Sequence, residues 1–212
     1  MALTNAAGAK PKARGRKSAG KRDAIMRAAV EVINERSYAQ ATMTEIAASL
    51  DLRDATLYYY FPSKQALAYA CHVRSMELFE RLLVEADRSS GTGLSKLTLF
   101  IRGMLEDAES NGPQLYFGDY SYLADDNRKH IGEWAARLTT MLEQFLIDGI
   151  AEGSVVPCEP HVVVQLLLGM LIWLAKWVPA IDGMTVDRLM SSIGVVSLDG
   201  LAAKCVPFTL KA

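Results

Sequence analysis

The sequence predicts an all-α protein. Alternating runs of β-branched residues are few among its 212 residues, whereas many windows repeat apolar residues at three- and four-residue spacing. Gly- and Pro-containing breaks separate these windows. Half of the residues are hydrophobic and 22% are charged, a globular composition that allows one or two domains with a sizeable core.

Residues 1–20 are predicted to form a basic, flexible arm. The first 22 residues carry seven basic residues and no acidic residue, so the rest of the chain has 16 basic and 24 acidic residues and a net charge of −8. A basic arm on an acidic body favours contact with a polyanion. A solvated tail is the alternative, and the two are compatible because arms that bind DNA are often disordered when free.

The cysteines and the N-terminus favour a cytoplasmic protein. No apolar core follows the first charges, as it does in a secretory signal. The cysteines are odd in number, widely spaced and without a CxxC pair: Cys71, Cys158 and Cys205. We therefore expect a reducing environment and no disulfide framework.

The first helices have the spacing of a helix-turn-helix. One helix is expected from about residue 22 to residue 36, and a second from Met43 to Leu50. The start of the second is marked by Thr42 and Glu45, which form an S/T-x-x-E capping box. Only three residues then lead to a third, aromatic helix, and this is the connection length of the motif. A fourth helix follows Pro62, with Ser63 as N-cap, and ends near residue 86.

The aromatic helix contains the run "DATLYYYFPSK", Asp54 to Lys64. Each residue of a helix turns roughly 100° from the last, so Leu57 and Phe61 share a face, which we expect to be buried. The direction opposite to them falls on Tyr59. The remaining members of the run divide between that outward face and its shoulders, with Ala55 and Thr56 beside Tyr59 and with Tyr58 and Tyr60 at the two sides.

The outward face suits the major groove of DNA, which admits an α-helix whose first residues reach base edges. Methyl groups of Ala55 and Thr56 fit a thymine methyl, and tyrosine hydroxyls bond phosphates. Lys64 and Thr42 lie at helix starts, where backbone N–H groups favour phosphate. The alternative is that the aromatics only pack a small helical domain. The capped helix, the short turn and the basic arm together favour DNA.

Four further helical windows follow: residues 94–108, 131–145, 161–178 and 186–204. The segment "VVVQLLLGMLIWLA", Val162 to Ala175, is apolar almost without a break. It is shorter than the roughly 20 residues that a membrane span needs. A helix that is apolar all round needs cover on every side, which a partner subunit supplies, so we expect a homodimer; a wholly internal core helix is the alternative.

The aromatic and methionine residues of this second part are candidates for an apolar ligand pocket with a few polar groups. Each of them is also compatible with ordinary core packing. The candidates are Met104, Tyr116, Phe117, Tyr120, Trp134, Met141, Trp173 and Trp177. The three histidines are far apart, and no Glu-x-x-His or His-x-x-x-His pair occurs, so the sequence indicates no metal site, no cofactor and no di-metal enzyme.

The stretch "ATMTEIAASLDLRDATLYYYFPSKQAL", Ala41 to Leu67, resembles the DNA-binding helix-turn-helix of the TetR family of one-component regulators. The resemblance implies an all-helical homodimer whose C-terminal helices bind a small molecule and pair in a four-helix interface. It places DNA contacts at Thr42, Arg53, Asp54, Ala55, Thr56, Tyr58, Tyr59 and Lys64. The run from Trp173 to Leu201 also resembles a subgroup whose effectors are acyl-coenzyme A thioesters.

Two positions depart from the family pattern at the turn. Asp51 stands where a glycine is usual, so we expect it to adopt a left-handed conformation, which Asp tolerates better than most residues. Arg53 stands where a serine N-cap is usual. Either Asp54 caps the helix in its place, or Arg53 reaches a guanine or a phosphate.

We therefore predict three parts: an arm at residues 1–20, a DNA-binding domain at residues 21–66, and a ligand-binding and dimerisation domain at residues 67–212. The expected function is transcriptional repression released by a small, largely apolar effector. Ligand-dependent activation is one alternative. A helical protein-interaction module that does not bind DNA is the other.

Overall fold

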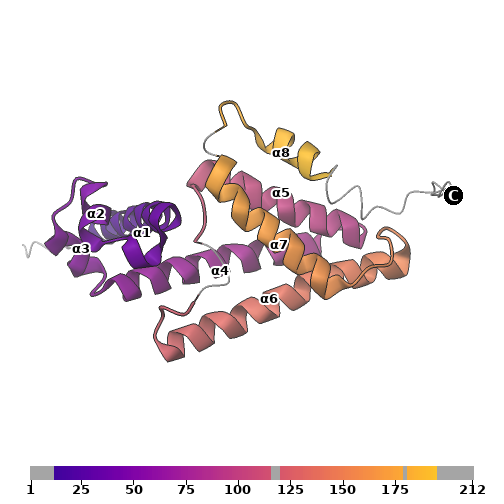
Figure 1. Cartoon of the computed structure of the whole chain (residues 1–212), viewed down its shortest axis with the longest axis horizontal. Coiled ribbons are helices and arrows are strands. Elements are labelled where there is room, and N and C mark those ends of the chain that lie inside the picture. The colour runs from indigo at the N-terminus through magenta and orange to yellow at the C-terminus, as the bar shows by residue number, and fades with distance from the viewer. Residues whose placement is uncertain (1–11, 116–119, 179–180, 195–212) are drawn as a thin grey trace, which may run out of the picture.

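The computed structural model describes residues 12–115, 120–178 and 181–194, and these residues form eight α-helices (Figure 1). The helices are α1 (Lys12–Gln40), α2 (Met43–Ala48), α3 (Asp54–Tyr60), α4 (Lys64–Arg88), α5 (Gly93–Asn111), α6 (Asp125–Glu152), α7 (Pro160–Trp177) and α8 (Val186–Ile193). We call α1–α3 the head and α5–α8 the body; α4 runs through both (Figure 1).

Local signals set the geometry of the head. The predicted capping box forms: the Thr42 hydroxyl accepts from the backbone N–H of Glu45, and the Glu45 carboxylate accepts from the backbone N–H of Thr42. Asp51 ends the α2–α3 turn with a φ of 53°, which confirms its predicted left-handed conformation. Phe61 ends α3 in an extended conformation, and the Ser63 hydroxyl then caps α4 by accepting from the N–H of Ala66.

Helix α1 is longer than the sequence suggests. It begins at Lys12 rather than near residue 22, so residues 12–20 of the predicted arm are helical, and residues 1–11 lie outside the described residues. It also continues past residue 36, through a kink at Ser37 with a φ of 75°, to Gln40. Helix α8 ends at Ile193, and the rest of the segment predicted to be helical, residues 195–204, lies outside the described residues.

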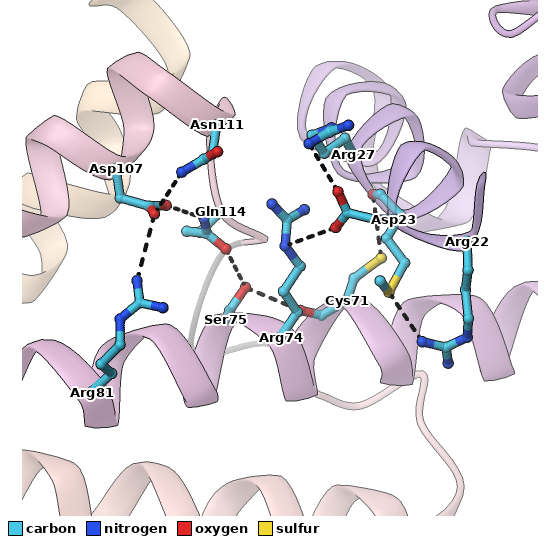
Figure 2. Close-up of polar contacts among 11 residues, drawn as sticks. Arg22, Asp23, Arg27, Cys71, Arg74, Ser75, Arg81, Asp107, Asn111 and Gln114 are labelled. Atoms are coloured by element: carbon cyan, nitrogen blue, oxygen red, sulfur yellow. Dashed lines mark hydrogen bonds and ion pairs between the residues drawn. The ribbon is translucent and has the colours of Figure 1, made fainter. Parts of the chain in front are cut away.

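A seam between α1 and α4 fixes the head on the body (Figure 2). Asp23 of α1 pairs with Arg74 of α4, with an oxygen–nitrogen distance of 3.6 Å. The Cys71 thiol donates to the carbonyl of Met26, and burial raises its pKa to about 12. This thiol is therefore a packing group, because a protonated, buried cysteine is a poor nucleophile.

In the body, α4, α5 and α6 pack on one another, α7 lies against α6, and α8 lies against α5. Their apolar faces form one core with that of the head. Helices α5 and α6 lie close together at Gly93, where an added Cβ atom would overlap the Phe145 carbonyl oxygen and would lie 2.6 Å from the Gly149 nitrogen. Only a residue without a side chain fits there.

Among the described residues, no helix has the length and hydropathy required to cross a bilayer.

The glycines of the body give a matched test of this packing. We expect Gly93→Ala to lower the free energy of unfolding by about 1–3 kcal/mol, because backbone atoms of α6 have to move. Gly132→Ala serves as the control, because no atom lies within 4 Å of its added Cβ and alanine is the better helix former; it should stabilise by about 0.5–1 kcal/mol. Urea titrations of both variants measure the difference, and equal midpoints would contradict the close approach.

Candidate nucleic-acid interface

Helix α3 presents the face that its sequence predicts. Leu57 and Phe61 are buried, with 0% and 2% of their surfaces exposed. Tyr59 is 82% exposed and Tyr58 50% exposed, so two phenols project from the head. The ring of half-buried Tyr60 lies edge-on to that of Tyr59, with centroids 5.2 Å apart. A helix with buried apolar anchors on one side and exposed phenols on the other is suited to bind a partner through its outer face.

The start of α3 is held by its neighbour α2. The carboxylate of Asp54 accepts a hydrogen bond from the Thr44 hydroxyl at 2.6 Å, and it also places negative charge in the first turn of α3. Arg53 occupies the N-cap position, but no side-chain hydrogen bond caps the helix there. Its exposed guanidinium side chain lies beside exposed Ala55, at the end of α3 that would enter a groove first.

Thr42 and Lys64 both lie at helix starts, and each has internal partners. The Thr42 hydroxyl and N–H hold the Glu45 carboxylate, and these bonds, with the nearby Arg36 charge, keep the pKa of Glu45 below its usual value. The Lys64 ammonium donates to the carbonyls of Tyr38 and Ala41 at 2.8 and 2.9 Å and lies over the Tyr38 ring. It therefore closes the end of α1, a role that the local sequence does not reveal.

Two neighbouring cavities of the body have mainly apolar linings, whereas a further one of about 440 Å³ between α4 and α5 is lined by polar residues such as Arg81 and Arg102. The first, of about 180 Å³, lies among α5, α7 and α8, and the second, of about 320 Å³, lies among α4, α6 and α7. They share a wall made by Phe79, Leu168 and Ile172. An apolar cavity of about 150 Å³ holds a benzene ring, so each space accommodates part of a small apolar molecule.

Among the side chains that the structure describes, which leave out residues 175 and 176 of α7, no lysine, arginine or histidine lines either cavity. The polar residues of the first are Glu109, Gln114 and Thr185, and those of the second are Tyr120, Thr139 and Gln165. A carboxylate inside such a space would lose its water without gaining a counterion. The cavities therefore favour an uncharged guest with few polar atoms.

The predicted pocket residues fall in different places. Met104 lines the first cavity and Tyr120 lines the second, whereas Tyr116 and Phe117 lie outside the described residues. Trp134 and Met141 are half-buried on α6 and line neither cavity. The Trp134 indole N–H is buried and has no hydrogen-bond partner among the described residues, and the centroid of its ring lies 5.6 Å from that of His130.

Trp173 and Trp177 share a face of α7, as their spacing predicts, but that face points outward. They are 63% and 38% exposed and line neither cavity. Exposed Val162 and Leu166 lie along the same helix. The residues that do line the cavities, such as Leu105, Leu168 and Leu189, are ordinary aliphatics, and nothing in their sequence pattern distinguishes them from core.

Within the described ranges, no group of three or more His, Cys, Asp or Glu side chains is arranged to hold a metal ion.

Family models match both parts of the chain. Residues 25–71 match bacterial regulatory proteins of the tetR family, and residues 90–201 match the tetracyclin repressor-like C-terminal domain. The chain belongs to the TetR family. It is therefore a DNA-binding transcriptional regulator and not an enzyme, and the resemblance of its helix-turn-helix is confirmed together with the all-α, two-part fold.

Individual relatives are more distant. The TetR-family chain is 28% identical over 141 residues to the fatty acid metabolism regulator protein of Bacillus subtilis (strain 168). The aligned region covers 62% of this chain and 69% of the relative. The ketosteroid transcriptional regulator KstR2 of Mycobacterium tuberculosis has a TM-score of 0.75 at 18% identity, over 87% of this chain and 96% of that one. AibR in complex with isovaleryl coenzyme A and operator DNA has a TM-score of 0.69 at 22% identity, over 84% and 98%. These two structures share its fold.

Proposed function

We propose that this TetR-family regulator is a dimeric repressor that leaves its operator when an uncharged acyl group enters the cavities of the body. The observation that supports this most directly is the combination of an outward phenol face on α3 with apolar cavities that lack cations. The first provides a surface for DNA, and the second selects the chemistry of the effector.

In this proposal the outer face of α3 lies in the major groove. Ala55, the Thr56 methyl and Arg53 approach base edges, and the hydroxyls of Tyr58, Tyr59 and half-buried Tyr60 bond phosphates on either side. Asp54 stays bonded to Thr44 and holds the helix rather than meeting the negative backbone. Further phosphates face the first turns of α2, which follows Thr42, and of α4, which begins at Lys64, because backbone N–H groups at helix starts favour phosphate.

The exposed face of α7 is the proposed dimer interface. Its Val162, Leu166 and Trp173 are 48%, 69% and 63% exposed, an unusual concentration of large apolar side chains on one helix of a soluble protein. Gly169 lies among them, and an added Cβ there meets no atom within 4 Å, so another helix can come close. A two-fold pair of heads would then read two half-sites about one helical turn apart.

The effector class follows from the walls of the cavities. A thioester carries no charge at its acyl end, whereas a free fatty acid would bring a carboxylate towards Glu109, the one carboxylate among the described lining residues. The name of the Bacillus subtilis relative and the isovaleryl coenzyme A bound by AibR support this chemistry. Binding then shifts the population towards a state with the wrong head separation and lowers operator affinity.

The double variant Thr56→Ala/Tyr59→Ala tests whether the outer face of α3 binds the operator. On a duplex selected by the wild-type protein from a random pool, we expect at least a tenfold weaker Kd by fluorescence anisotropy, because a base contact and a phosphate contact are lost. Light scattering should show an unchanged oligomeric state. The control Thr140→Ala/Ile147→Ala changes exposed residues of α6 and should bind normally; equal losses in both would remove α3 from the interface.

A panel of ligands tests the effector. We expect coenzyme A thioesters, with acyl chains of about four to about sixteen carbons, to weaken operator binding at least tenfold at their best length. The matching free acids and coenzyme A alone should have little effect, because neither brings an uncharged apolar group to the cavities. Release by the free acids at equal concentration would contradict the charge argument.

A further inference from the structure

We propose that Gln114 and Tyr122 are the positioning residues that couple the cavities of the body to the head. The inference deepens the proposed function, because it names how occupation of the cavities is transmitted to α3. It rests on two separate sets of contacts, each of which joins a residue at or near a cavity to helix α1.

Gln114 follows α5 and contacts three helices. Its side-chain oxygen accepts from the Ser75 hydroxyl of α4 at 3.1 Å, and its side-chain nitrogen donates to the Asp107 carboxylate of α5 at 3.0 Å (Figure 2). Its main-chain carbonyl accepts from the side-chain nitrogen of Asn34, on α1, at 2.9 Å. The same residue lines the first cavity. The side chain therefore fixes the carbonyl that holds the head.

These bonds are partly covered, because Gln114 is half-buried and its partners on α1 and α4 are buried. Asn34 is 6% exposed and Ser75 is 1% exposed. A buried amide that loses its partner destabilises the protein, so a shift of the Gln114 carbonyl is expected to draw Asn34, and with it α1, along. Asp107 is itself held by Asn111 at 2.9 Å and lies 3.8 Å from Arg81, which anchors the far side of this network (Figure 2).

Tyr122 makes the second connection. Its ring stacks on that of Tyr38 at the end of α1, with centroids 3.8 Å apart and planes 10° apart. Its hydroxyl lies 2.8 Å from the His72 Nε2 of α4, and its carbonyl accepts from the Gln65 side chain at 2.7 Å. Tyr120, two residues earlier, lines the second cavity.

Tyr38 continues this connection into the helix-turn-helix. The Lys64 ammonium lies 4.3 Å from the centre of the Tyr38 ring and bonds the carbonyls of Tyr38 and Ala41. Ala41 directly precedes Thr42, the N-cap of α2. A guest that displaces Gln114 thus moves the carbonyl that holds Asn34 of α1, and one that displaces Tyr120 moves the neighbouring Tyr122 against Tyr38 at the last turn of α1. In this proposal α2 and α3 move with α1.

A cavity-filling substitution tests this coupling without any effector. Leu171 and Gln114 both line the first cavity. The larger side chain of Leu171→Trp fills part of this cavity and so mimics a bound ligand. We expect it to weaken binding to the selected operator at least tenfold, measured by anisotropy. Ile147→Trp, at an exposed position of α6 away from both cavities, is the control and should change the Kd less than about threefold.

The decisive comparison places Leu171→Trp in a protein whose Gln114 and Tyr122 contacts to the head have been removed by substitution. Gln114→Met keeps the length of the side chain but removes both amide bonds; Ser75 keeps its bond to the Cys71 carbonyl, and Asp107 keeps Asn111, so no buried group is left unpaired. Tyr122→Leu removes the stacked ring. In the Gln114→Met/Tyr122→Leu protein, Leu171→Trp should weaken operator binding less than about threefold, and this loss of additivity measures the coupling.

Two results would overturn the proposal: Leu171→Trp leaves operator affinity unchanged, or it weakens binding by the same factor in both backgrounds. Gln144→Met, at an exposed glutamine of α6 bonded only to Asp148, should preserve the full effect and controls for the substitution type. If circular dichroism shows that Leu171→Trp does not fold, Met104→Trp, which lines the same cavity, replaces it. Because no ligand is added, failure of the thioesters as effectors is distinguishable from failure of the coupling.

Discussion

The burial of Leu57 and Phe61 determines what this protein presents to its surroundings. These two side chains, one helical turn apart, anchor α3 in the head, and the guanidinium of Arg22 lies 4.7 Å over the Phe61 ring as a further contact from α1. With that rotation fixed, a seven-residue helix has only one direction in which Tyr59 can point. A one-residue change of register would place a tyrosine at the buried face and would turn Leu57 and Phe61 towards solvent, and the surface for DNA would disappear.

Helix α4 connects the head, which contains α3, to the body. It forms the seam with α1 through Cys71 and Arg74, contributes Phe79 to the wall between the cavities, and packs against both α5 and α6. The head is therefore held by a helix that also contributes Phe79 to the walls of both cavities. The proposed coupling of the cavities to the head uses direct contacts, because residues of the body contact helix α1 of the head within one packed unit.

The sequence predicts features whose causes are local. The capping box of Thr42, the left-handed Asp51 and the outward direction of Tyr59 each depend on residues a few positions apart, and the structure has all three. It does not predict contacts between distant segments, such as the Lys64 ammonium on the carbonyl of Tyr38 or the Asn34 amide on Gln114. Spacing correctly placed Trp173 and Trp177 on one face, but only tertiary packing decides which face of α7 is covered.

The most direct test of the account is methylation interference at guanine N7 on the selected operator, because N7 lies in the major groove. Two copies of α3 reading successive grooves predict two patches of interference centred about one helical turn, ~34–36 Å, apart. Both patches should disappear at the concentration where Thr56→Ala/Tyr59→Ala still binds through charge alone. A single patch, or interference confined to adenine N3 in the minor groove, would contradict the account.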